Sequence, residues 1–248
     1  MGSDPIIRIL AIDAGNTRIK WGVRDGEAWA ARGAVATNDA QSLTSDWPAL
    51  VADARAIACN VAGADVRAAI AAVCEQRGLR IAFIASEASR LGVTNGYRDP
   101  AQLGTDRWAA LVAAHHASRG NKLVVNVGTA LTVDALTADG RFLGGVIVPG
   151  PALMRRSLDR GTADLRLTEG AFMPFPTSTP DAITSGSIQA CVGAIERIRA
   201  AMAAQGAAPD AIVLSGGAAA QLAPHLPMPA ALNENLVLDG LVLIARDS

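Results

Sequence analysis

The stretch "LAIDAGNTRIKWGV", residues 10–23, decides the fold. An apolar run of strand-forming residues breaks at Asp13 and Gly15, passes through asparagine and threonine, and then resumes. A β-branched run that ends in glycine predicts a strand followed by a turn. The continuation "RIKWGVRDGEAWA" predicts a second strand and a further turn at Asp25–Gly26. We therefore expect the chain to open with a hairpin.

The same design returns in residues 122–150, "KLVVNVGTALTVDALTADGRFLGGVIVPG". Alignment of "LAIDAGNT" with "LVVNVGTA" places Asp13 over Asn126 and Gly15 over Gly128. Two duplicated halves that face each other would form a cleft between two such turns. Coincidence between two ordinary buried strands is the alternative.

The remaining segments alternate between strand and helix patterns. Helices are expected from Thr105 or Asp106 to Gly120, after an N-cap at Asp65, and over residues 151–161, 181–206 and 235–246. Residues 80–89 predict a buried strand, and "AIVLSGG" predicts a strand that runs into a glycine turn. This alternation indicates an α/β protein, and 248 residues are enough for two modest domains.

Composition excludes several classes of function. The net charge is −1 and no basic run occurs, so nucleic acid is not an expected partner. No apolar run approaches the ~20 residues that a spanning helix needs, so no membrane segment is expected. Cys59, Cys74 and Cys191 are odd in number and lack metal-ligand spacing, which predicts free thiols in a reducing, cytoplasmic setting.

The first glycine turn has the chemistry of a phosphate site. Gly15 lets the backbone approach phosphate oxygens, Asn16 and Thr17 supply short donors, and turn N–H groups form an anion nest. Asp13 cannot bind phosphate itself, but it can hold Mg²⁺ whose other ligands come from a nucleotide. A plain hairpin with polar turn residues is the alternative.

Lysine usage adds a candidate to this turn. The chain has 20 arginines but only two lysines, Lys20 and Lys122. Where arginine is so strongly favoured, a retained lysine suggests a need for a compact point charge, so Lys20 is a candidate to neutralise phosphate. Chance retention of a surface lysine would explain it equally.

The second turn offers Gly128, Thr129 and Thr132 as donors and Asp134 as a further carboxylate. A third glycine turn, Gly216–Gly217 in "LSGG", could lie beside adenine and ribose. Neither the G-x-x-x-x-G-K-[ST] pattern of P-loops nor the G-x-G-x-x-G dinucleotide pattern occurs.

These spaced segments resemble the phosphate-1, phosphate-2 and adenosine motifs of the actin and hexokinase superfamily. The motifs "GTDRWAAL", "GGVIVPG" and "TPDAITSG" make the chain similar to the type III pantothenate kinases, over residues 10 to about 244. The resemblance implies duplicated ribonuclease-H-like (actin-like ATPase) halves, 1–119 and 120–248, each a mixed β-sheet flanked by helices. It further implies ATP and Mg²⁺ bound between the halves, and transfer of the γ-phosphoryl group to pantothenate. The product would be 4′-phosphopantothenate, at the first step of coenzyme A biosynthesis.

The resemblance also implies roles for particular residues. Asp106 matches the catalytic base that takes the proton of the pantothenate hydroxyl. A helix N-terminus should keep its carboxylate ionised and therefore a weak base, although phosphoryl transfer tolerates late deprotonation. A simple helix N-cap is the alternative role for this aspartate. The substrate contacts implied by the match are Tyr97, Gly104, Thr105, Asp106, Arg107 and Thr179.

Three of these matches carry further expectations. Arg107 could hold the substrate carboxylate in a bidentate pair, or form a salt bridge within the protein. In the family Thr179 comes from the neighbouring subunit, which implies a homodimer with a shared substrate site; Ser178 replaces the usual asparagine beside it. Asn126 stands where the family has an aspartate that binds K⁺ or NH₄⁺. An asparagine offers a carbonyl oxygen without charge, so we expect weakened cation binding.

Two rival functions stay open on the sequence. One is a sugar or acetate kinase of the same superfamily, which the segment from Tyr97 to Arg107 disfavours. The other is a non-catalytic nucleotide-binding regulatory protein, which the presence of Asp106 disfavours.

Overall fold

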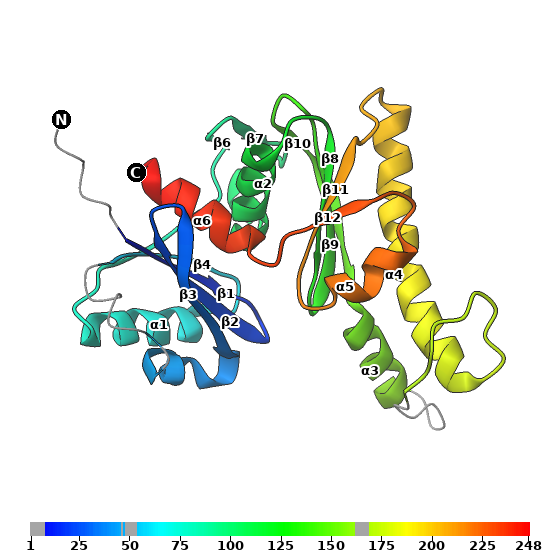
Figure 1. Ribbon diagram of the computed structural model, residues 1–248, viewed down its shortest axis with the longest axis horizontal. Helices are drawn as coiled ribbons and strands as arrows, with labels where there is room; N and C mark the ends of the chain where they lie inside the picture. The colour runs from blue at the N-terminus through cyan, green and yellow to red at the C-terminus, as the bar shows by residue number, and fades with distance from the viewer. Residues whose placement is uncertain (1–7, 46, 48–53, 162–168) are drawn as a thin grey trace. The chain divides into compact units, whose positions relative to one another are not determined.

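The computed structural model describes residues 8–45, 47, 54–161 and 169–248, and the chain divides into two compact units (Figure 1). The first unit comprises the chain up to His116 together with Asn235–Ser248, and the second is Ala117–Glu234. The division falls near the expected boundary at residues 119 and 120. The C-terminal segment differs from expectation, because it clusters with the first unit.

The first unit is built on five strands in the order β3-β2-β1-β4-β5. These are β1 (Ile9–Ala14), β2 (Arg18–Asp25), β3 (Ala28–Ala36), β4 (Arg55–Asn60) and β5 (Ile81–Phe83). β1, β2 and β3 are joined antiparallel, as the glycine break and the Asp25–Gly26 turn predict. β4 then pairs parallel with β1, and β5 parallel with β4.

The two faces of this sheet are covered by different helices (Figure 1). Leu10, Ile12 and Ala14 point into a core that includes Ile70 and Cys74 of α1 (Ala64–Gln76) and Leu43 of η1 (Thr37–Ser45), a 3₁₀ segment. The other face is packed against α6 (Leu236–Arg246). Because side chains alternate along a strand, Asp13 points to the α6 face.

The other elements of the first unit follow β5. They are the hairpin strands β6 (Ser89–Arg90) and β7 (Val93–Asn95), the 3₁₀ turn η3 (Pro100–Gln102) and the helix α2 (Thr105–Ala117).

The second unit contains the strand order β12-β11-β8-β9-β10. Their bounds are β8 (Lys122–Val127), β9 (Ala130–Leu136), β10 (Arg141–Pro149), β11 (Ala211–Ser215) and β12 (Ala230–Leu232). The helical segments are α3 (Pro151–Gly161), α4 (Thr179–Ala204), α5 (Ala219–Leu222) and η4 (Ala223–His225). Cys191 and Ile195 of α4 and Leu222 of α5 form the core with the strands.

The two units repeat one topology, which confirms the expected duplication. In each, three antiparallel strands come first, a fourth strand pairs parallel with the first, and a fifth pairs parallel with the fourth. The backbone bonds repeat as well: Val61 N donates to Ala14 O at 3.0 Å, and Ala218 N donates to Val127 O at 3.0 Å. Asp13 and Asn126 therefore occupy matching places on β1 and β8.

Three local expectations need correction. Asp65 lies in the first turn of α1, whose N-cap is Gly63. The strand expected over residues 80–89 is only β5, which is partly exposed because it is the edge of its sheet. α2 ends at Ala117, before the expected stop at Gly120, whose φ of 95° lies outside the helical range. Among the described residues, no helix has the length and apolarity needed to span a membrane.

Candidate functional site

Asp13 is placed by its neighbours on both sides of β1. In the antiparallel register it lies opposite Lys20 of β2, and in the parallel register beside Cys59 of β4. All three side chains share the α6 face of the sheet. The Cys59 thiol is fully buried and its Sγ donates to Asp13 Oδ1 at 3.3 Å. Burial and the nearby carboxylates raise the pKa of this thiol well above its ordinary value, so it remains a donor.

Asp13 holds its proton more tightly than an ordinary aspartate. Burial and then the charge of Asp106 raise its pKa, whereas the Cys59 hydrogen bond and the Lys20 charge lower it, and the net result is a rise from 3.8 to about 6. The electrostatic coupling brings Asp13 and Asp106 into one site. Two partly buried carboxylates in one site favour positive charge nearby, and the charges of Lys20 and Arg107 act on them.

Asp106 lies in the first turn of α2, and its Oδ1 accepts from the N–H of Arg107 at 2.8 Å. Its ionisation differs from the sequence expectation. Burial raises the pKa of the Asp106 carboxyl, although the Arg107 N–H and the Arg107 charge both act to lower it. The prediction of a weak base was therefore wrong in direction, because desolvation outweighs the helix terminus.

Helix α2 is held close to the sheet by a small residue and a hydroxyl. A Cβ at Gly240 of α6 would lie 1.9 Å from Ala109 O, so only glycine lets α6 and α2 cross here. At the start of α2, Thr105 Oγ1 accepts from Asn60 N at 3.3 Å and lies 3.5 Å from Asn60 O. These contacts place the first turn of α2 against the end of β4.

Tyr97 and Arg107 form a pair beside Asp106. Arg107 Nη1 donates to the Tyr97 hydroxyl at 2.9 Å, and the Arg107 guanidinium carbon lies 5.7 Å from the tyrosine ring centroid. Arg107 is only 5% exposed. The tyrosine hydroxyl thus orients a buried guanidinium whose charge also acts on the neighbouring Asp106 carboxyl.

The first glycine turn is closed by a hydrogen bond of its own backbone and by Thr37, the first residue of η1. Gly15 N donates to Arg18 O at 3.1 Å, and Thr37 Oγ1 donates to Gly15 O at 2.6 Å. Asn16 and Thr17 are exposed at its tip. These donors are therefore accessible to an anion, as the motif predicts.

The second unit holds the other nucleotide candidates. Asn126 of β8 lies beside Ser215 of β11 and opposite Thr132 of β9. Gly216 follows Ser215 with a φ of 98°, and a Cβ there would lie 2.6 Å from Asn126 Oδ1. The second and third glycine turns therefore meet at Asn126.

The remaining candidates of the second turn differ in exposure. Gly128 is exposed and Thr129 is partly exposed, and Thr129 O accepts from Gly150 N at 2.9 Å. Gly217 is also exposed. Asp134, by contrast, is 1% exposed and lies against Gly145 within the strands, which argues against its role as an accessible carboxylate.

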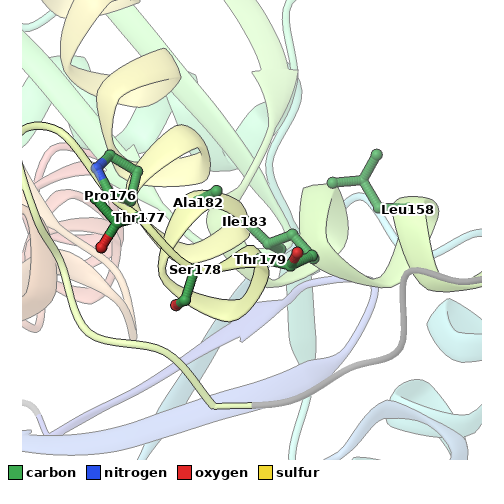
Figure 2. A pocket seen from close by; sticks show the side chains of 7 residues that line it. All are labelled: Leu158, Pro176, Thr177, Ser178, Thr179, Ala182 and Ile183. Carbon is green, nitrogen blue, oxygen red and sulfur yellow. The ribbon is translucent and has the colours of Figure 1, made fainter.

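Thr179 lies at the first turn of α4, on the wall of an open hollow of about 520 Å³ (Figure 2). Ser178 is the N-cap: its Oγ accepts from Asp181 N at 3.3 Å and donates to Asp181 Oδ2 at 2.6 Å. Serine and asparagine are comparable N-caps, so Ser178 keeps the helix start that places Thr179. The hollow is lined by Leu158, Pro176, Thr177, Ser178, Thr179, Ala182 and Ile183.

The carboxylates fit a divalent cation only in combination with another ligand. Among the described residues, no cluster of three His, Cys, Asp or Glu side chains could hold a metal. Asp13 and Asp106 nevertheless form a partly buried, electrostatically coupled acidic pair, and the exposed turn at Asn16 and Thr17 is suited to phosphate. This donor set fits Mg²⁺ that arrives with a nucleotide, because Mg²⁺ is usually held by one or two carboxylates plus phosphates.

The tertiary structure adds positioning residues that motif reading missed. Cys59, Asn60 and Thr37 contact Asp13, Thr105 and Gly15 from segments distant in the chain. None of the three belongs to a motif with a recognisable spacing, and the sequence predicts Cys59 only to be a free thiol.

Comparisons with known proteins identify relatives of this chain. A family model described as type III pantothenate kinase matches residues 9–201. A type III pantothenate kinase of Aromatoleum aromaticum is 49% identical over 239 residues, covering 96% of this chain and 98% of the relative. One from Nitrosospira multiformis is 45% identical over 241 residues, covering 97% and 92%.

Solved structures agree on the fold. A candidate Baf family transcriptional activator from Campylobacter jejuni superposes with a TM-score of 0.63 at 19% identity, covering 96% of this chain and 98% of that one. A candidate 2-dehydro-3-deoxygalactonokinase from Sinorhizobium meliloti gives 0.57 at 19% identity, with the same coverages of 96% and 98%. At such identities the likeness shows the fold alone.

Proposed function

Because the chain belongs to the type III pantothenate kinase family, we propose that Asp106 takes the proton of the pantothenate hydroxyl while Asp13 holds the Mg²⁺ of ATP. The family activity is ATP-dependent phosphorylation of pantothenate, which begins coenzyme A biosynthesis. The observation that supports the assignment is the place of Asp106 in the first turn of α2, where it acts electrostatically on Asp13 and where burial raises its pKa, because a base needs affinity for the proton that it removes.

The other candidates are assigned by their chemistry. The N–H groups and hydroxyls of the turns at Gly15–Thr17 and Gly128–Thr129 bind phosphate oxygens, and Gly216–Gly217 lies beside the nucleoside. Lys20 neutralises phosphate next to Asp13, its partner in the ladder. When bound, Mg²⁺ neutralises the charge of the transferring phosphoryl group. Asp106 orients the attacking hydroxyl, which is where positioning contributes most.

The test is a coupled ADP-release assay with pantothenate. We expect Asp106→Asn to cut turnover by about 100-fold or more. Asp65→Asn is the matched control, because Asp65 also lies in the first turn of a helix of 13 residues, away from the site. Turnover of Asp106→Asn close to that of this control would overturn the assignment.

The same assay separates the rival functions. A sugar or acetate kinase would release ADP with those acceptors and not with pantothenate. A regulatory protein that only binds nucleotide would release ADP with none of them. The likeness to the candidate Baf family activator is confined to the fold and favours neither rival.

Arg107 is suited to bind the carboxylate of pantothenate, with Tyr97 and Gly104–Thr105 completing the substrate contacts. The support is the buried guanidinium held by a neutral hydroxyl. Such a guanidinium can form a bidentate pair with an incoming carboxylate.

We further propose a homodimer in which Thr179 completes the substrate site of the partner subunit. Thr179 is exposed beside an open hollow, and Phe175 in the preceding loop is 89% exposed, which favours a covering partner. Mixing Asp106→Asn with Thr179→Val should restore activity, because one site of the mixed dimer is then intact. Two inactive variants whose mixture stays inactive, with mixed dimers verified by mass spectrometry, would contradict a shared site.

The cation requirement and the cellular setting complete the proposal. Asn126 lacks the charge that would hold K⁺ or NH₄⁺ tightly, so we propose a weak dependence on monovalent cations. Cys59, Cys74 and Cys191 are all free and buried, which supports a reducing, cytoplasmic setting.

A further inference from the structure

We propose that Cys59 and Asn60, the last two residues of β4, are positioning residues that hold Asp13 and Asp106 in their working places. The inference rests on the roles proposed above for these two carboxylates. One residue acts on Asp13 through its side chain, and the other acts on the start of α2 through its backbone.

The contact with Asp13 is made by the Cys59 thiol. Cys59 is 0% exposed, and its Sγ donates to Asp13 Oδ1 at 3.3 Å. Lys20 flanks the same carboxylate from β2, so neighbours on both adjacent strands limit its rotation. A thiol is a neutral donor, so it orients the carboxylate without competing with a metal ion for its charge. An arginine or lysine at position 59 would neutralise that charge.

The duplication provides an independent sign that this place has a function. In the second unit, Ser215 of β11 neighbours Asn126 in the same parallel register in which Cys59 neighbours Asp13. Ser215 is also buried, at 4% exposure. Both halves therefore place a short buried donor beside the polar residue that precedes the glycine turn, although the residue types differ.

Asp106 is positioned indirectly, by hydrogen bonds of Asn60 and Thr105. Asn60 Nδ2 donates to Gly63 O at 2.9 Å and its Oδ1 accepts from Ala62 N at 3.3 Å, which closes the loop after β4. The Asn60 backbone in turn engages Thr105 Oγ1, one residue before Asp106. The hydroxyl of Thr105 is thus used to fix the first turn of α2.

The positioning role of Cys59 is tested by direct metal binding. Electron paramagnetic resonance would measure Mn²⁺ affinity in the presence of a non-hydrolysable ATP analogue, so the readout does not depend on turnover. Cys59→Ala and Cys59→Val should each weaken Mn²⁺ binding by about threefold to tenfold, the size of one neutral hydrogen bond. Cys59→Ser keeps a donor and should stay within about twofold of the natural protein.

Cys74→Ala is the matched control, because Cys74 is an equally buried free thiol in the α1 core of the same unit. It should leave Mn²⁺ affinity unchanged even if it lowers stability. Equal Mn²⁺ affinities for Cys59→Val, Cys59→Ala and Cys74→Ala would overturn the Cys59 role. So would a folded Cys59→Ser variant that binds as weakly as Cys59→Val.

The positioning role of Asn60 and Thr105 is tested by steady-state kinetics. Thr105→Val and Asn60→Ala should lower kcat by about threefold to tenfold with little change in the KM for pantothenate, and Thr105→Ser should restore kcat. A raised KM at unchanged kcat would instead mean that Thr105 acts only through the substrate contact proposed above, and would remove the positioning role. If the natural protein fails to phosphorylate pantothenate, the proposed function falls, whereas the Mn²⁺ measurements still decide the Cys59 role.

Discussion

Arg107 Nη1 donates to the hydroxyl of Tyr97 at 2.9 Å, so a buried cation is held in place by a neutral group. This bond orients the guanidinium, whose charge also acts on the Asp106 carboxyl. The pair comes from two segments, the loop before η3 and the first turn of α2. If Arg107 binds the substrate carboxylate as proposed, Tyr97 sets the geometry of that contact.

Tyr97→Phe should therefore weaken pantothenate binding more than it slows phosphoryl transfer. Loss of one hydrogen bond to a charged group is worth about 1.5–3 kcal/mol, so the KM for pantothenate should rise by about 10-fold or more. The KM for ATP should not change. Initial rates over both substrate concentrations give these constants, and an unchanged pantothenate KM would exclude the role.

Asp13→Asn should stabilise the nucleotide-free protein at neutral pH while it abolishes activity. The folded-state pKa of about 6 lies above 3.8, so the folded state binds the proton more tightly and stability falls as the pH rises between these values. The cost of the partly buried charge at pH 8 is on the order of 3 kcal/mol. Urea unfolding in EDTA at pH 5 and pH 8 measures it. If the variant exceeds the natural protein in unfolding free energy by the same amount at both pH values, ionisation of Asp13 is not the cause.

The raised pKa of Asp13 also predicts how the Mg²⁺ requirement changes with pH. Mg²⁺ needs ionised Asp13, so the KM for Mg²⁺ should rise as the pH falls through about 6. Initial rates over a range of Mg²⁺ concentrations at pH 5.5 and pH 8 would show it. A pH-independent requirement for Mg²⁺ would speak against Asp13 as the metal ligand.

Gly216→Ala should damage the second unit, and Gly217→Ala should not. Gly216 has a φ of 98° and a Cβ there would lie 2.4 Å from Val127 O, whereas a Cβ at Gly217 would meet nothing within 4 Å. We expect a loss of at least about 2 kcal/mol in unfolding free energy for Gly216→Ala. Asn126 also lies against Gly216. The KM of the Gly216→Ala variant for ATP should therefore rise. Urea unfolding and ATP kinetics of both variants test this, and similar behaviour of the pair would refute it.

Asn126→Asp should create the charged cation ligand that the chain lacks. The natural protein should work at similar rates in Tris, Na⁺ and K⁺ buffers, whereas the variant should gain a dependence on K⁺ or NH₄⁺. Thermal unfolding with increasing KCl gives a second readout, since a bound ion stabilises the folded state. A natural protein whose rate collapses without K⁺ would show that Asn126 already supports the ion.

Local chemistry explains which parts could be predicted from the sequence. The breaks at Gly15 and Gly128 and the turn at Asp25–Gly26 follow from residue type and spacing, and the duplication follows from their repetition. Asp65 was misplaced because an N-cap depends on the backbone conformation at one residue. The length and burial of strand β5 were overestimated, because an apolar run does not reveal that the strand lies at the edge of its sheet.

The sequence by itself determined the strand–glycine–strand design of both halves and the residues at its turns, because hydrophobic period and turn conformation are properties of neighbours in the chain. Tertiary structure alone decided how those residues behave. Strand register brings Cys59 onto Asp13 across 46 positions, and the α6 crossing at Gly240 lets α2 carry Asp106 to the same site. The burial that raises both carboxyl pKa values exists only once these distant segments have packed.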